Sequence, residues 1–317
     1  MSDRLFLILF LAIPLVFVVL DGIELRRAPA NGGRGRPSGE ALVFLGLVIA
    51  LYAVIQFGGF ALTPSPDALM EAVRPTLARW LHRPLSAEPI RGPWLAALTV
   101  ILFYVSGLWD YLLHRVFSHS RMFFFTHEYH HLPSQVHVAM PGLAVRPFAV
   151  VTSFPTSAAT VVSAYAILLL LGLPLWDLAP IKILLLIQAL LLTASHSCFL
   201  RRWWPLHHGM KWLALTTPQE HLLHHTVDLQ GNYGNFTILW DRVFGTYLDP
   251  MRAEHEGHAL GLAYDQDFLG TLTLGRLKLP RPVRERFQVG RYCNLDLEDV
   301  ASRRGENAAG ADQPGRP

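Results

Sequence analysis

The chain has 317 residues, of which 51% are hydrophobic and only 16% charged, and its mean hydropathy is +0.30. This composition is too apolar for an ordinary soluble domain and indicates an integral membrane protein. The net charge of +3 comes mostly from arginines outside the apolar runs, which favours a role in membrane topology and lipid-headgroup contact over nucleic-acid binding. The two cysteines, Cys198 and Cys293, are too few for a disulfide framework and are compatible with a reducing compartment.

The N-terminal third predicts two membrane spans and one helix at the membrane surface. Residues 5–20 form a charge-free apolar run with no small-residue cleavage pattern after it, so we expect a transmembrane anchor and no signal peptide. Arginines at positions 26, 27, 34 and 36, with the Gly and Pro of residues 28–38, predict a basic flexible loop before a full-length second span at 41–62. Residues 65–81 begin with an N-cap pattern and then carry an apolar residue at every fourth position, which predicts an amphipathic interfacial helix.

Three further spans are predicted, and two of them lead directly into histidines. Residues 94–113 form the third span, which runs into His114. The apolar run 148–173 and a second run that ends at Ala194, just before His196, predict a helical hairpin. If the first loop is cytoplasmic, the third and fifth spans both end on that side, so the histidines share one face of the membrane. The loop before the third span also carries four arginines, so charge alone does not fix the orientation.

The histidines of the chain are concentrated between residues 114 and 225, which hold 12 of the 15. Two His-x-x-His-His trios, at 127–131 and 221–225, place their imidazoles within about 100° of helix arc, so we expect each trio to aim at one point. His114 and His119 are about 140° apart on an ideal helix and face one point only where the helix ends or distorts. Neutral imidazoles bind Zn, Fe, Cu and Ni, so the pattern predicts a metal centre. Three other histidines, taken singly, are more simply explained as hydrogen-bonded core residues: His137, His207 and His208.

The histidine boxes and their flanks resemble the fatty acid hydroxylase/sterol desaturase superfamily, whose members are membrane non-haem diiron enzymes. The resemblance covers roughly residues 95–250. Its three boxes correspond to His114/His119 and to the 127–131 and 221–225 trios, and many relatives have one residue fewer between the first two histidines. His196, in Ser-His-Ser, is similar to an additional histidine that the family carries at the end of the hairpin. The flanking matches are Asp110-Tyr111, Arg146-Pro147, Thr217-Pro218, Asn232-Tyr233-Gly234 and the run from Trp240 to Tyr247.

The resemblance implies an all-α integral membrane protein, in which a transmembrane helical bundle of about five spans carries a cytosolic histidine-rich metal-binding cap. It implies O2-dependent hydroxylation or desaturation of a C–H bond in a membrane lipid, such as a sterol or a fatty acyl chain. Electrons would come from a cytochrome b5 or ferredoxin-type donor with its reductase. We divide the chain into N-terminal helices (1–93), a catalytic region (94–255) and a C-terminal tail (256–317), which we expect to be disordered after about residue 300.

The resemblance also names the residues of the site. Asp110, Glu128 and Asp241 are candidates for carboxylates that accept hydrogen bonds from ligand histidines and fix their tautomers. A solvated or helix-capping carboxylate is an equally simple explanation for each of them. The nine histidines implied to hold two iron ions are His114, His119, His127, His130, His131, His196, His221, His224 and His225.

Two other classes of function are open at this point. Residues 127–131 also read His-Glu-x-x-His, with which zinc peptidases place two ligands and a general base on one helix face. An integral-membrane zinc metallopeptidase that uses His127, Glu128 and His131 is therefore the alternative hypothesis, although it leaves at least six clustered histidines unexplained. A transporter with histidine proton relays is the other class. Relays are expected along intramembrane helices, whereas these histidines sit at helix ends and in polar segments.

Overall fold

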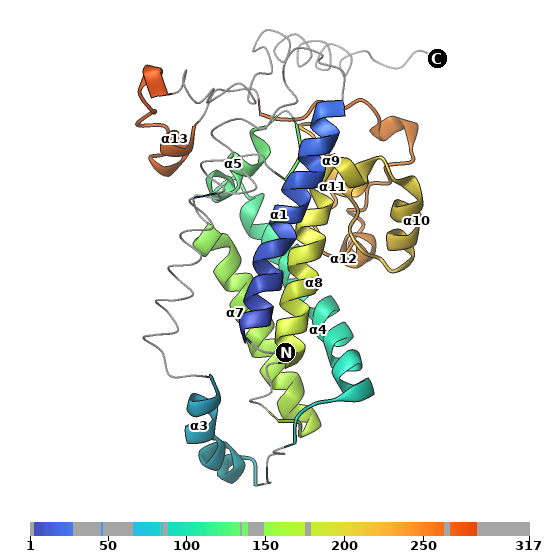
Figure 1. The fold of residues 1–317 in the computed structure, drawn as a ribbon. Coiled ribbons are helices and arrows are strands. Elements are labelled where there is room, and N and C mark those ends of the chain that lie inside the picture. The colour runs from blue at the N-terminus through green and yellow to red at the C-terminus, as the bar shows by residue number, and fades with distance from the viewer. Residues whose placement is uncertain are drawn as a thin grey trace, which may run out of the picture.

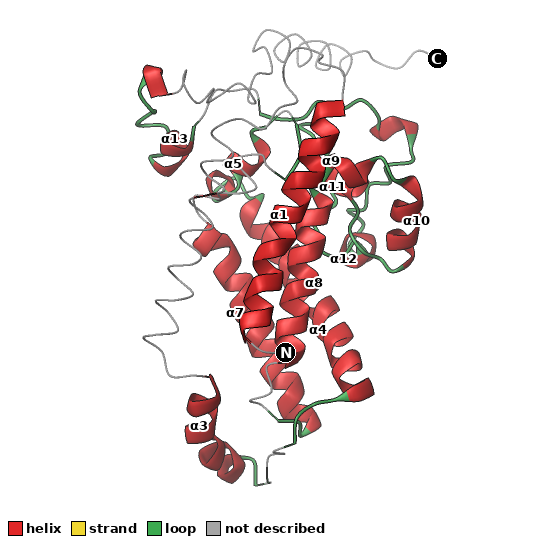
Figure 2. Cartoon of the chain, viewed as in Figure 1, coloured by secondary structure: helices red, strands yellow, loops and turns green. Residues whose placement is uncertain are grey.

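The described part of the protein is mostly helical, as predicted, with long loops between the short helices (Figure 2). The computed structural model describes residues 3–27, 46, 66–82, 84, 88–133, 135–138, 149–174, 179–262 and 267–283. Within these ranges there are α-, 3-10 and π-helices and two isolated β-bridges, and no longer strand. The predicted second span at 41–62, apart from Gly46, and the tail after residue 300 lie outside the described residues.

Four long helices form a bundle (Figure 1). They are α1 (Asp3–Arg27), α4 (Gly92–Leu112), α7 (Ala149–Leu171) and α8 (Ala179–Ser195). α4 packs against both α7 and α8, and α1 packs against α8. The apolar sequences of these helices explain the packing, since Leu102 of α4, Ala164 of α7 and Leu184 of α8 are buried in one cluster.

Two of the described helices are long and apolar enough to cross a membrane. They are Arg4–Arg27 and the continuous segment Gly92–Ser118, which match the predicted first and third spans. The described apolar stretches of the predicted hairpin, Pro155–Leu171 and Ala179–Ser195, are shorter than these two. The total of five spans therefore stays a prediction.

The first helix continues past the predicted apolar run, and this corrects the predicted loop. Arg26 and Arg27 form the last turn of α1, where we expected flexible chain. The helix continues past Asp21, which follows the apolar run. The side chain of Asp21 is fully buried and accepts hydrogen bonds from segments beyond the hairpin. Glu24, one turn later, pairs with Arg202 at 2.9 Å. The end of α1 is therefore bound to the region that follows α8.

Short helices gather at one end of the bundle and form a cap (Figure 1). They include α5 (Glu128–His131), α9 (Cys198–Arg201), α10 (Trp204–Trp212), α11 (Pro218–His224), α12 (Leu239–Val243) and α13 (Phe268–Leu272). α1, α4 and α8 end at this cap, whereas α3 (Pro66–Trp80), the predicted amphipathic helix, lies at the opposite end (Figure 1). Gly107 lets the cap approach α4 closely, because a Cβ there would lie 2.5 Å from the Thr237 methyl group. The histidine-bearing ends of α4 and α8 thus meet in one place.

Candidate metal centre

A π-helical segment at the end of α4 brings the first two histidines together. η1 (Leu113–Ser118) continues α4, and the His119 N–H donates to the His114 carbonyl at 3.1 Å. The ring centroids of these two histidines are 5.0 Å apart. An ideal α-helix would separate them by about 140°, so the extra residue in the π-turn is the distortion that their spacing requires.

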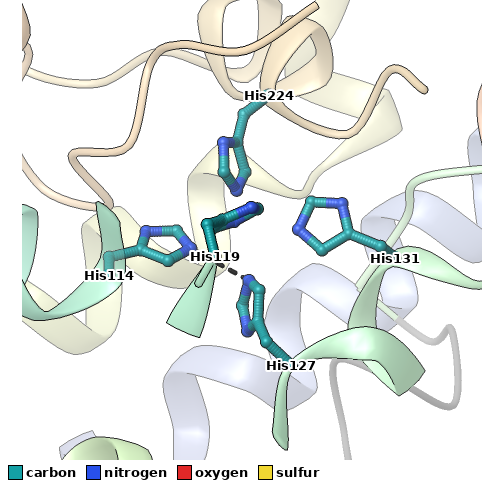
Figure 3. A group of neighbouring side chains, drawn as sticks. All are labelled: His114, His119, His127, His131 and His224. Carbon is teal, nitrogen blue, oxygen red and sulfur yellow. Dashed lines mark hydrogen bonds between the residues drawn. The ribbon is translucent and has the colours of Figure 1, made fainter. Parts of the chain in front are cut away.

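Nine histidines converge at the cap in two adjacent groups, and within each group the ligand nitrogens all lie within 4.8 Å of one another. Figure 3 shows the first group, in which four rings are arranged around that of His119 in this view. The two groups touch, since the ring centroids of His131 and His225 are 4.6 Å apart. These nine are the histidines that the sequence predicts as ligands. Group A consists of His114, His119, His127, His131 and His224, and group B of His130, His196, His221 and His225.

Each His-x-x-His-His trio is divided between the two groups, so the expectation that each trio aims at one point is wrong. The first and last histidines of each trio stay together, namely His127 with His131 in group A and His221 with His225 in group B. The middle histidines, His130 and His224, belong to the opposite groups. The reason is that consecutive residues of a helix point about 100° apart, so the middle and last rings diverge. Each trio therefore contributes to both groups.

The nitrogen spacing within the groups fits bound metal ions. His114 Nε2 and His127 Nε2 are 2.9 Å apart, as are His221 Nε2 and His196 Nε2. Two nitrogens that each lie about 2.1 Å from one ion are separated by about 3.0–3.4 Å, depending on the coordination angle. His119 Nε2 is buried and has no hydrogen-bond partner among the described residues. Neutral nitrogen donors without thiolates suit iron or zinc.

Backbone carbonyls hold three of these histidines in the tautomer that a metal ligand needs. The Nδ1 atoms of His114, His196 and His224 lie 2.5, 2.8 and 3.0 Å from the carbonyl oxygens of Tyr233, Leu192 and Gly231, respectively. Because a carbonyl oxygen only accepts, each Nδ1 carries the proton, and the lone pair that can bind a metal is on Nε2. The acceptors are thus main-chain groups where we expected carboxylates.

Two of the three predicted carboxylates bind residues that lie next to His114. Asp110 accepts hydrogen bonds from the main-chain and side-chain N–H groups of Asn235, whose Nδ2 lies 3.3 Å from His114 Nδ1. Asp241 accepts from both main-chain N–H groups of residues 233–234, in the loop whose carbonyl holds His114. Burial raises the pKa of Asp241 to about 6. Both carboxylates therefore fix the loop that orients His114.

Glu220 begins the helix that carries the second trio, and sequence reasoning missed it. In the capping box at the start of α11, the Thr217 side chain accepts from the Glu220 N–H, and the Glu220 carboxylate accepts from the Thr217 N–H at 3.0 Å. The Tyr247 hydroxyl donates to the other carboxylate oxygen at 2.9 Å. Burial raises the pKa of Glu220 to about 7, against the effect of these hydrogen bonds. The run Thr-Pro-Gln-Glu is the sequence signal that would have found this cap.

Asp21 of α1 is the second residue that sequence reasoning missed. Its carboxylate accepts hydrogen bonds from the Ser197 hydroxyl and from the main-chain N–H groups of Phe199 and Val138. It thereby holds the first turn of α9, which begins two residues after His196. No local pattern signals this role, because an acidic residue after an apolar run is typical of the end of a span.

Burial keeps three of the clustered imidazoles neutral. It lowers the pKa of His119, His221 and His225 well below 6.5, and neighbouring histidines lower the pKa further. At neutral pH each of these rings therefore carries a single proton and has one nitrogen lone pair. This is the state in which imidazole binds a metal cation.

The other predicted residues lie outside both groups. His207 of α10 is fully buried with its Nδ1 2.8 Å from the Thr217 hydroxyl, so it supports the cap of α11. Burial lowers the pKa of both His207 and His137 to about 4. His208 is exposed, so the core role expected for it is wrong, and its ring lies 5.4 Å from that of His207. Glu128, the third predicted carboxylate, is the half-buried first residue of α5.

A cavity of about 370 Å³, lined by both apolar and polar side chains, leads from the bundle to group A. Its walls come from α4, α7 and α8, and its lining includes His114 and His127 of group A. Val161 of α7 and Leu185 of α8 also line it and are 38% and 39% exposed, so the cavity opens on the outer face of the bundle. A second cavity of about 190 Å³ borders both groups through His119 and three other histidines.

Comparison with known proteins agrees with the position of this site. The family model described as fatty acid hydroxylase matches residues 99–246, a range that includes all nine histidines of groups A and B. No curated protein and no solved structure matches the chain.

Proposed function

We propose that the chain is an O2-dependent diiron oxidoreductase, which hydroxylates or desaturates a C–H bond of a membrane lipid. The reason is that residues 99–246 belong to the fatty acid hydroxylase/sterol desaturase superfamily. The observation that carries the proposal is the convergence of nine imidazoles, in two adjacent groups, beside a cavity. One ion uses at most about six ligands, so nine nitrogens favour two ions.

Group A would hold one iron ion and group B the other. Bound iron supplies the redox chemistry that activates O2, for which no side chain is suited. His114 and His127 belong to group A and also line the cavity, so a lipid carbon in the cavity would lie next to group A. The main-chain carbonyls of residues 231 and 233 keep the Nε2 atoms of His224 and His114 directed at the group.

With a lipid chain bound, the cavity would fix the orientation of the substrate and exclude water from the reacting carbon, which the oxidation of an unactivated C–H bond requires. Most of its apolar side chains come from α8, and Val161 comes from α7. It opens beside Val161 and Leu185, on the outer face of helices that we place in the membrane. A lipid chain would therefore enter sideways from the bilayer.

We place the chain in the membrane as a multi-pass protein, with the histidine cap on the cytoplasmic side. The support is that α1, α4 and α8 all end at the cap, and that Arg26 and Arg27 close α1 there (Figure 1). Each turnover with O2 needs two electrons beyond those of the substrate. An external donor, of the cytochrome b5 or ferredoxin type with its reductase, would supply them.

The zinc-peptidase alternative gains no support. His127 and His131 of the His-Glu-x-x-His motif share group A with three further histidines, which is more than a peptidase site needs. The family match is to hydroxylases. The alternative also leaves group B without a role.

The experiment that tests the proposal is lipid analysis under isotopically labelled O2. Cells that express the wild-type chain should accumulate a lipid that carries the label, or a desaturated lipid formed with consumption of O2. His130→Ala should abolish this product, whereas His258→Ala, outside both groups, should keep it. Full activity of His130→Ala, or lipid turnover by iron-loaded protein without O2 consumption, would exclude the proposed function.

A further inference from the structure

The cavity that leads to group A contains a chain of hydrogen bonds that the proposed oxidation does not use. Gln188 of α8 donates to the Ser106 hydroxyl of α4 at 2.6 Å, and Ser106 Oγ lies 3.0 Å from the Thr160 hydroxyl of α7. All three residues line the cavity. The three side chains come from three helices, and hydrogen bonds of this kind also hold the helices of a membrane bundle together. What distinguishes this chain of hydrogen bonds is that it lines the cavity that leads to group A.

The direction of this hydrogen-bond chain follows from its last link. Thr160 donates its one hydroxyl proton to the Thr156 carbonyl at 2.8 Å, so Ser106 must donate to Thr160 and accept from Gln188. Both hydroxyl protons are then used. The Gln188 carboxamide keeps its carbonyl oxygen and one N–H, for which the described residues provide no partner. An acceptor and a donor therefore stand side by side on the cavity wall.

The position of this carboxamide relative to group A is set by α4. Ser106 and Asp110 of α4 and His114 of η1 follow one another at every fourth position of this continuous helical segment, and all three line the cavity. The helix rises about 12 Å between Ser106 and His114. A ligand atom held by Gln188, beside Ser106, would thus sit about 12 Å along the cavity from group A.

We infer that the lipid substrate carries a hydroxyl group, which pairs with Gln188 about 12 Å from the carbon that is oxidised. A hydroxyl both donates and accepts, so it satisfies the carbonyl and the N–H of the carboxamide together. An ether or ester oxygen only accepts, and it would leave the Gln188 carbonyl unpaired in the cavity. The substrate class is therefore hydroxylated lipids such as long-chain alcohols. This inference rests on the proposed function, which leaves the lipid unspecified.

Competition between two ligands that differ in one donor proton tests the inference. The full-length protein in lipid nanodiscs is cross-linked to a photoreactive diazirine analogue of cetyl alcohol, and unlabelled cetyl alcohol or cetyl methyl ether competes. We expect the alcohol to compete about tenfold more strongly than the ether, which is the effect of one buried acceptor left unpaired. In Gln188→Met, which removes the carboxamide at similar volume, the two ligands should compete equally.

Thr99→Val is the matched control variant. Thr99 is a buried hydroxyl of the same α4 helix and bonds to the Leu95 carbonyl, but it does not line the cavity. It should keep the preference for the alcohol. Equal competition in the wild-type protein, or an unchanged preference in Gln188→Met, would overturn the inference, and the wild-type result decides even if the variant does not fold. Because binding needs no iron, this failure is distinct from an absence of O2-dependent oxidation, which would overturn the proposed function.

Discussion

The Ser197 hydroxyl donates a hydrogen bond to the Asp21 carboxylate at 2.5 Å, across 176 positions of sequence. Ser197 directly follows His196 of group B, and Asp21 also accepts from the N–H of Phe199. The N-terminal helix thus fixes the corner from which His196 reaches the cluster. Helix α1 therefore supports the site, although it lies outside residues 99–246, which match the family.

Replacing Asp21 with Asn should lower the free energy of unfolding by about 1–3 kcal/mol, because the new amide N–H group would face N–H donors and leave a buried group unpaired. Group B should lose metal before group A, since His196 belongs to group B. Thermal unfolding in detergent and metal analysis check both outcomes. Glu24→Gln is the control on the same helix, and loss of its partly exposed ion pair with Arg202 should cost less than about 1 kcal/mol. Equal losses in the two variants would contradict a specific role for Asp21.

Iron-loaded wild-type protein should hold about two metal ions per chain. His224→Ala and His130→Ala should each lower this number, because they remove a nitrogen from group A and from group B, respectively. His255→Ala should keep the full metal content, since His255 lies outside both groups and its Nδ1 bonds to the Asp249 carbonyl. Elemental analysis of purified protein provides the count. A reproducible value of one ion in the wild-type protein would rule out the dinuclear centre.

Glu128→Gln separates the oxygenase from the peptidase. In the oxygenase the change should reduce lipid oxidation by at most about 10- to 100-fold, the size of effect that groups around a metal ligand usually have. In a zinc peptidase it would remove the general base and abolish activity while the metal stays bound. Lipid oxidation rates and metal content of the two proteins, measured in parallel, decide between them. Complete loss of oxidation with full metal content would count against the role that we assign to Glu128.

Glu220 should lower the free energy of unfolding as the pH rises from about 4.5 to about 7, and Glu220→Gln should remove this contribution. Burial raises the pKa of Glu220 from 4.5 to about 7, so in this window the folded protein binds a proton that the unfolded chain has released. The free energy of unfolding contributed by this group therefore falls with rising pH. The buried histidines act in the opposite direction, so the difference between wild type and variant isolates Glu220. Melting temperatures across this pH range provide the test, and parallel curves would contradict it.

Reporter fusions after residues 35, 125 and 215 should all report the cytoplasm. The reason is that α1, α4 and α8 end at the same cap (Figure 1). Fusion activity in living cells measures the side directly. If positions 125 and 215 lie on opposite sides of the membrane, groups A and B could not share one site, and the metal centre would be disproved.

The sequence predicts the nine clustered histidines because ligand spacing and flanking motifs are local patterns. The helix geometry separates the middle and last rings of each trio, but which rings share a group depends on contacts between distant segments, such as that of His130 with His225, which no local pattern predicts. Asp21 had no local signal, since its partners Val138 and Phe199 lie 117 and 178 positions away. Glu220 is different, because its capping box with Thr217 is a local pattern that we did not use.

The type of helical turn determines how many residues can separate the first two histidines of the site. A π-turn is an α-turn with one residue inserted, so its hydrogen bond joins residues five apart in place of four. A chain with one residue fewer between His114 and His119 would close the turn with an α-helical bond and still present both rings to group A. The inserted length is accommodated away from the metal centre, where Val116 is 67% exposed. We therefore expect histidine pairs separated by three or by four residues to build the same half of the site with different turns.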